Sequence, residues 1–242
     1  MKPFSKWTIA EAEGRFGLIL QKQCRLLKEW LTVQDTLSEE DEKKLNALCE
    51  SLQDYAYDWN EAELKLKFIG PLLLTVNFDQ EKYHSFMERE ISVAIENEIL
   101  SGITDFLVAR GRRVPSHPYF FIHEYKKERD SSNDPLGQLM TAMVAAQKLN
   151  NDNNPLYGAY IMGRLWFFVV LYGVEYCVSL GHNAAKPEEL KEIFGILRNT
   201  KKIIEQLISD EGSGYGVRGS GCEKTSHPEP RTSNPLSKEN LE

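Results

Sequence analysis

Two short apolar segments constrain the fold of this 242-residue chain more than any other feature of its sequence. Residues 103–109 and 119–125 are apolar at both odd and even positions, which is typical of strands that are covered on both faces of a sheet. Residues 111–118, which lie between them, are rich in proline and arginine and predict a connecting loop. We therefore expect an α/β fold in which a loop joins two central strands.

Other patterns indicate helices and further strands around this pair. Apolar residues at a period of two predict a half-buried strand over 86–96. Asp134 and Pro135 are expected to start a helix that ends in the turn at 150–155, and Pro187 suits the first turn of a last helix. The remaining elements expected are helices over 59–71 and 187–209 and strands over 157–162, 165–171 and 175–180.

The two ends of the chain differ from its middle. Residues 9–31 predict one amphipathic helix, and Ser38 followed by acidic residues predicts a second helix that runs to about residue 57. We expect residues 1–58 to form an antiparallel helical hairpin that packs on the main domain, residues 59–209, or on a second copy in a homodimer. Residues 210–242 hold five glycines and three prolines and predict a flexible tail.

Composition excludes several classes of protein. The four cysteines are scattered without a CxxC pair, which argues against a zinc ribbon or a disulfide scaffold and favours a reducing compartment. The longest apolar run, residues 165–174, is too short for a membrane span, and the N-terminus has no apolar signal core. A cytoplasmic protein without a membrane partner is therefore expected. The net charge of −7 provides no overall attraction for nucleic acid.

Charged residues interrupt the two central strands. Asp105 lies in the first strand, and Glu124 and Lys126 lie on one face of the second. An unpaired buried carboxylate costs several kcal/mol or more, so these charges need a reason to be there. If the two strands pair as a hairpin, Asp105 can lie beside Glu124.

Metal-assisted hydrolysis of a phosphodiester is the chemistry that suits this set. Two carboxylates can hold Mg²⁺, or Mn²⁺ in its place, and a lysine on the same face can orient or deprotonate water or stabilise developing charge. The alternative is an ordinary ion pair between Glu124 and Lys126 at the point where the strand reaches solvent.

These residues resemble a known family. Asp105, then Glu124-Tyr125-Lys126 nineteen residues on, then Gln138 in a helix, is similar to the PD-(D/E)XK nuclease superfamily. Residues 63–73 resemble the first-helix motif of type I restriction-enzyme N-terminal domains, where a glutamate precedes an Ile-x-Pro-x-Leu segment. The sequence departs from the family at Thr104, where the family often has proline.

The resemblance implies a restriction-endonuclease-like core, a mixed central β-sheet flanked by helices, over roughly residues 59–180. It implies that Asp105, Glu124 and Glu63 hold the metal, that Lys126 is the catalytic lysine and that Gln138 lies close by. The activity implied is Mg²⁺-dependent hydrolysis of DNA. The alternatives are a nuclease-fold protein that no longer cuts and acts as a nucleic-acid- or protein-binding module, and a structural protein with incidental strand charges.

Several residues have competing interpretations. Glu61 is an alternative to Glu63 on the same helix, and Gln147 is a weaker alternative to Gln138. His123 is expected to point to the face opposite Glu124 as a structural histidine. The basic residues that could contact DNA phosphates are Arg110, Arg112, Arg113 and Lys127, and solvated loop charges are the other interpretation.

Overall fold

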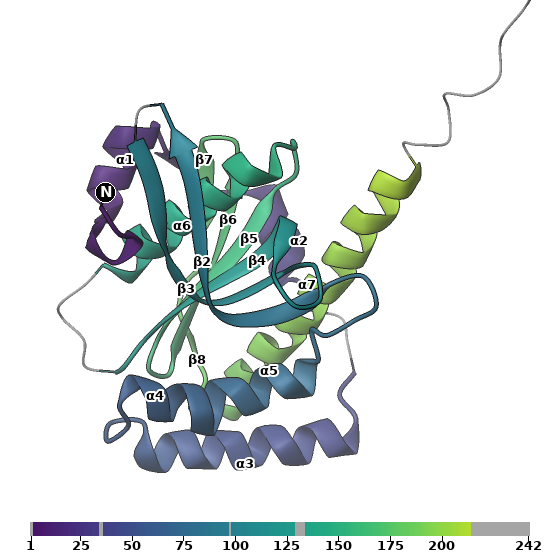
Figure 1. The fold of residues 1–242 in the computed structure, drawn as a ribbon. Helices are drawn as coiled ribbons and strands as arrows, with labels where there is room; N and C mark the ends of the chain where they lie inside the picture. Colours follow the sequence, from purple (N-terminus) through teal and green to yellow (C-terminus); the bar gives the residue numbers. More distant parts are fainter. Residues whose placement is uncertain (1, 34–35, 97, 129–133, 214–242) are drawn as a thin grey trace, which may run out of the picture.

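A mixed β-sheet forms the centre of the fold in the computed structural model, which describes residues 2–33, 36–96, 98–128 and 134–213 (Figure 1). Seven strands run in the order β1-β7-β6-β5-β4-β3-β2, and β8 pairs with β6. The pairs β4/β5 and β1/β7 are parallel and the others antiparallel. The strands are β1 (Ile19–Leu20), β2 (His84–Ile95), β3 (Glu98–Arg110), β4 (Ser116–Lys126), β5 (Leu156–Met162), β6 (Leu165–Tyr172), β7 (Glu175–Val178) and β8 (His182–Asn183).

Helices cover the sheet through two separate apolar cores. The helical segments are η1 (Phe4–Lys6), α1 (Ile9–Phe16), α2 (Arg25–Leu31), α3 (Glu39–Tyr55), α4 (Glu61–Leu64), η2 (Lys65–Ile69), α5 (Gly70–Val76), α6 (Pro135–Asn150) and α7 (Pro187–Ser213). One core joins α1 and α6 to the sheet, and the other joins α2 through α5 and α7. Because neighbouring strand residues such as Phe168 and Val169 belong to different cores, both faces of the central strands are buried.

The predicted α/β class with a mixed, helix-flanked sheet is confirmed. The two apolar segments form β3 and β4, which pair antiparallel around the Pro- and Arg-rich turn. Asp134 caps α6, because its Oδ1 accepts a 2.9 Å hydrogen bond from the Gly137 amide. The last helix starts at Pro187 as expected and runs to Ser213, so it includes the first residues of the predicted tail; residues 214–242 lie outside the described residues.

The prediction of a single helix over 9–31 is wrong. Gly17 ends α1 in the left-handed conformation (φ 66°), and the chain then adds β1 to the edge of the sheet before α2 begins. Helix α1 packs on α6, whereas Trp30 of α2 packs in the other core. The apolar residues of this segment therefore pack on opposite faces of the sheet, and residues 1–58 do not form a helical hairpin.

The helix over 59–71 was predicted to end near Pro71, but it continues to Val76. A π-helical turn, η2, ends at Ile69, two residues before Pro71, and widens the helix where the proline ring would otherwise meet the preceding turn. A Cβ at Gly70 would lie 2.9 Å from the Lys65 carbonyl oxygen, so this turn favours glycine. The turn also places Lys65 at the point where the helix faces the sheet.

None of the helices in the described residues is both long enough and apolar enough to cross a membrane. Cys24, Cys49 and Cys177 are free thiols, and Cys222 lies outside the described residues.

Candidate active site

Strands β3 and β4 bring the two predicted carboxylates together. Their register pairs Phe106 with His123, and one further step places Asp105 opposite Glu124. Beyond the Phe106–His123 pair a side chain joins the two strands: Asp105 Oδ2 accepts a 2.8 Å hydrogen bond from the backbone amide of Tyr125. The predicted hairpin therefore forms, and Asp105 lies one residue beyond its last paired position, Phe106.

Glu124 is fully buried and is held by the following helix. Gln138, in the first turns of α6, donates a 2.6 Å hydrogen bond from Nε2 to Glu124 Oε2. Glu124 Oε1 and Gln138 Oε1 have no hydrogen-bond partner among the residues that the structure describes. Burial, and then the neighbouring Asp105 carboxylate, raise the pKa of Glu124 well above its ordinary value. The site thus holds two buried oxygens that need a donor or a cation.

Lys126 lies at the end of β4 and is also buried. Its Nζ donates a 3.0 Å hydrogen bond to the Tyr125 carbonyl oxygen and lies 4.0 Å from Glu61 Oε2 on α4. Asp105, Glu124, Lys126 and Gln138, four of the residues singled out from the sequence, therefore meet at one end of the β3–β4 pair.

Lys65 is a member of this site that the sequence analysis missed. Its Nζ donates to Asp105 Oδ1 at 2.6 Å and lies 3.1 Å from Glu61 Oε1 and 3.6 Å from Glu88 Oε1. Burial alone would lower the pKa of Lys65, but the hydrogen bond and charge of Asp105, and then those of Glu61, raise it. Its spacing of four residues from Glu61 was a usable signal, since such residues share a helix face.

The structure places Glu61, and not Glu63, at the site. Glu63 Oε2 accepts a hydrogen bond from the Asn60 amide in a capping box, and its Oε1 pairs with Lys67 at 2.9 Å. The prediction that Glu63 supplies the outer carboxylate is therefore wrong in its placement, because the cap holds that side chain away from the strands. Glu61, two residues earlier, contacts both lysines of the site.

The predicted phosphate contacts separate into two groups. Arg110 ends β3 five residues after Asp105, about 17 Å along the strand at about 3.4 Å per residue. Arg112 and Arg113 follow it in the turn to β4. Lys127 directly follows Lys126 and is exposed. Lys127 therefore lies at the same end of the sheet as the site, and the arginines lie at the other end.

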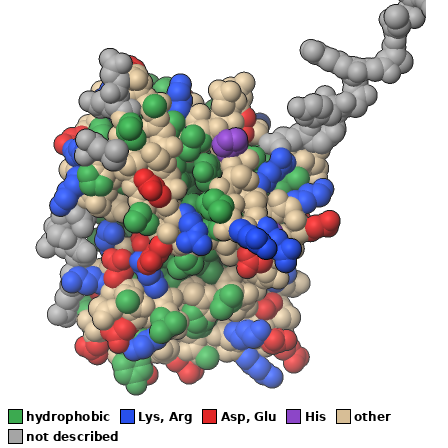
Figure 2. Space-filling view, viewed as in Figure 1, with side chains coloured by type: hydrophobic (Ala, Val, Ile, Leu, Met, Phe, Trp, Pro, Cys, Tyr) green, Lys and Arg blue, Asp and Glu red, His purple; other side chains and the backbone are tan. Residues whose placement is uncertain are grey.

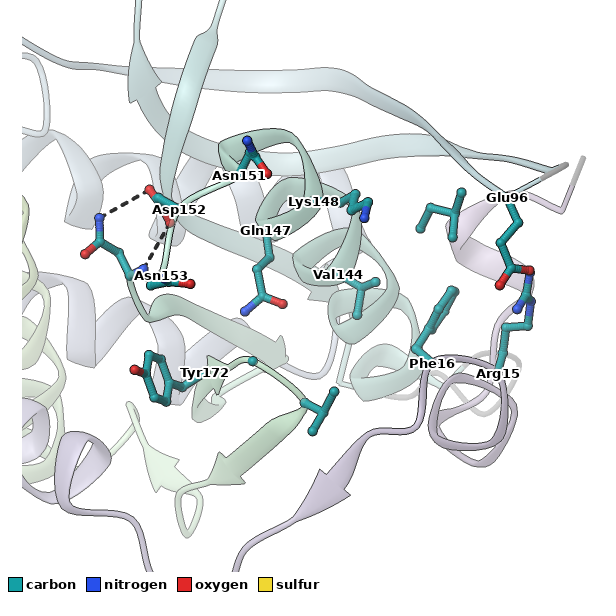
Figure 3. A pocket seen from close by; sticks show the side chains of 14 residues that line it. Arg15, Phe16, Glu96, Val144, Gln147, Lys148, Asn151, Asp152, Asn153 and Tyr172 are labelled. Carbon is teal, nitrogen blue, oxygen red and sulfur yellow. Dashed lines mark hydrogen bonds and ion pairs between the residues drawn. The ribbon is translucent and has the colours of Figure 1, made fainter. Parts of the chain in front are cut away.

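His123 takes the structural role that was favoured for it, and Gln147 lies away from the site. His123 Nδ1 lies 3.0 Å from the Tyr125 hydroxyl on the other face of β4, and burial lowers the pKa of His123 to about 3. Gln147 lies nine residues after Gln138 on α6, about 13 Å along the helix. It lines a separate cavity of about 710 Å³ between the end of α6 and the β6–β7 turn (Figure 3).

An apolar groove borders the site. It has a volume of about 540 Å³ and runs between α4–α5 and β2, with Lys65 and Glu88 at its edge and Leu66, Leu74 and Met87 among its lining residues. Figure 2 shows acidic and basic side chains gathered beside an apolar hollow where the sheet meets these helices. The groove leaves open space next to the Lys65 side chain.

The carboxylates of this site could hold a metal ion that takes only a few protein ligands. No group of three or more His, Cys, Asp or Glu side chains is placed to hold a metal ion in the part of the chain that the structure describes. Asp105 and Glu124 still offer carboxylate oxygens, which suit Mg²⁺ because that ion keeps several waters and takes few protein ligands. No protein-family model matches this chain, and no curated protein matches it.

Proposed function

We propose that this chain is a divalent-metal-dependent nuclease with a restriction-endonuclease-like core that hydrolyses phosphodiester bonds in DNA. The observation that supports it is the convergence of Asp105, Glu124, Lys126 and Gln138, with one buried Glu124 oxygen that has no hydrogen-bond partner among the described residues. The order of elements adds support: a helix, the strands β2, β3 and β4, then α6, and then β5 parallel to β4.

The residues present fit a hard divalent cation. A buried acceptor without a donor is rare in folded proteins, and Glu124 Oε1 has none within the part of the chain that the structure describes. Asp105 and Glu124 would hold Mg²⁺, or Mn²⁺ in its place. When bound there, the metal supplies a lowered pKa for coordinated water and stabilises charge on the phosphate.

The residues around the two carboxylates then have distinct roles in the reaction. Gln138 fixes the Glu124 carboxylate through their hydrogen bond, and Glu61 keeps the Lys126 ammonium near the carboxylates. Lys126 orients the attacking water or balances the negative charge that develops on the phosphate. In the reaction a bond forms between the water oxygen and phosphorus, the bond to the leaving oxygen breaks, and that oxygen gains a proton. Lys127 is placed to contact a neighbouring phosphate.

A cleavage assay tests this proposal. Supercoiled, linear and single-stranded DNA are incubated with the protein in Mg²⁺ or Mn²⁺, with EDTA as the metal-free control. We expect metal-dependent cleavage that falls at least about 100-fold in Lys126→Ala. Lys67→Ala is the matched control, since Lys67 pairs with Glu63 on the surface. No cleavage by the wild type, or full activity in Lys126→Ala, would contradict the proposal.

A second candidate function is a nuclease-fold module that binds nucleic acid or protein without cutting. The observation that favours it is the Lys65–Asp105 ion pair, which neutralises part of the site without a metal. Such a module should hold its partner equally well with EDTA present, and its retention of DNA on a gel should not depend on Mg²⁺.

A further inference from the structure

We propose that Lys65 competes with the divalent cation for Asp105, so that the metal binds only when Lys65 leaves this carboxylate. The inference rests on the metal site of the proposed function and concerns how that site is assembled. It starts from the position of the Lys65 ammonium, 2.6 Å from Asp105 Oδ1.

Both oxygens of Asp105 are already engaged. The Tyr125 amide occupies Oδ2 and Lys65 occupies Oδ1. A divalent ion bound to the same carboxylate would lie within a few ångströms of the ammonium, where the two positive charges repel. Because the Lys65 and Asp105 side chains are only 16% and 14% exposed, water screens this repulsion weakly.

Lys65 also has other carboxylate partners close to Asp105. Glu61 and Glu88 lie 3.1 and 3.6 Å from its Nζ, and their side chains are more exposed than that of Asp105. Lys65 and Glu88 both line the apolar groove, so the lysine can turn toward Glu88 through open space. The ammonium therefore keeps a carboxylate partner when it leaves Asp105.

An incoming phosphate diester would favour the same movement. Its negative charge attracts the ammonium away from Asp105 and leaves Oδ1 for the cation. Metal affinity in the free protein is then low, and DNA raises it. By linkage, the metal raises the affinity for DNA by the same factor. Lys65 acts in this scheme as a positioning residue that sets the order of assembly.

Calorimetric titration with Mn²⁺ tests the inference without a cleavage step. We expect Lys65→Met to bind Mn²⁺ at least tenfold more tightly than the wild type, and Lys65→Gln to change in the same direction. Lys67→Met, which removes the same charge from an exposed position on the same helical segment, should bind like the wild type. Circular dichroism of each variant checks that it folds, and Lys65→Gln decides if Lys65→Met does not.

Equal or weaker Mn²⁺ binding in the Lys65 variants, or binding in none of the proteins, would overturn the inference. These results are distinguishable from failure of the proposed function. A wild type that cleaves DNA while the ratio of Mn²⁺ affinities stays at one overturns the role of Lys65 alone. A wild type that does not cleave, with tighter Mn²⁺ binding in Lys65→Met, overturns the nuclease proposal and keeps the competition.

Discussion

Gln138 donates a 2.6 Å hydrogen bond to the buried carboxylate of Glu124 and so ties the start of α6 to the end of β4. The other carboxylate oxygen of Glu124, Oε1, and the amide oxygen of Gln138 have no hydrogen-bond partner among the described residues. Helix α6 therefore supplies one hydrogen-bond donor to a carboxylate that can accept more. The other Glu124 oxygen, Oε1, lies at the site formed with Asp105.

Removing the Gln138 donor should destabilise the protein. Gln138→Leu leaves a buried carboxylate oxygen unsatisfied, and we expect the free energy of unfolding to fall by about 1–3 kcal/mol. Urea unfolding measures the change. Gln23→Leu is the control, since the Gln23 side chain is exposed and should tolerate the same substitution. Equal stability of Gln138→Leu and the wild type would show that the bond contributes nothing.

The two glutamates of α4 should behave differently. Glu61→Gln removes the carboxylate that faces both site lysines, and we expect DNA cleavage to fall at least about tenfold. Glu63→Gln keeps a residue that suits the capping box and loses only a surface ion pair, so stability should change by less than about 0.5 kcal/mol. Its cleavage rate should match that of the wild type. The reverse order of effects in the same assay would restore the original assignment of Glu63.

Trp30 should be one of the main anchors of the N-terminal segment. Its ring contacts Phe121, Tyr157 and Phe168 edge-on, and its Nε1 donates a 2.9 Å hydrogen bond to Thr200 Oγ1. We expect Trp30→Ala to lower the free energy of unfolding by about 3–5 kcal/mol. Thermal or urea unfolding measures this, with Leu66→Ala at an exposed position as the control. A small effect would mean that α2 adds little to the core.

His123 should make stability depend on pH. Burial lowers the pKa of His123 to about 3, whereas an unfolded histidine titrates near 6.5. Between these values the unfolded chain binds a proton that the native protein does not, so the free energy of unfolding falls as pH drops from about 6.5 toward 3. The full contribution is on the order of 5 kcal/mol.

The substitution His123→Phe isolates the contribution of His123 to the pH dependence of stability. Phenylalanine keeps an aromatic ring against Phe121 and Trp166 and removes the titrating group. Unfolding measured at several pH values should show a shallower loss of stability in the variant, and His117→Gln, at an exposed position, should keep the wild-type slope. Parallel curves for His123→Phe and the wild type would contradict the prediction.

The sequence predicted the site where local patterns were sufficient. Asp105 and Glu124 stand out because charge is costly in strands that are apolar on both faces, and the antiparallel turn between those strands aligns them. The start of α6 follows from the Asp134 cap, whereas Gln138 was singled out only by the family resemblance. The placement of the two carboxylates and of this helix needs only strand alternation, one turn and one helix start.

Other features depend on packing that local patterns do not encode. Glu61 and Glu63 differ by about 200° around a helix, so the docking of α4 decides which one faces the strands. The Asn60-x-x-Glu63 capping box was a local signal that could have removed Glu63 from the site. The split of residues 9–31 between two faces of the sheet depends on β1 pairing with β7, which is distant in sequence.

Anomalous diffraction from crystals grown with saturating Mn²⁺ tests the central claim most directly. We expect one manganese peak in contact with the carboxylates of Asp105 and Glu124, with the Lys65 ammonium moved from Asp105 toward Glu61 or Glu88. Absence of a peak there, with Lys65 still on Asp105, would contradict a metal site at this end of the sheet and the nuclease mechanism built on it.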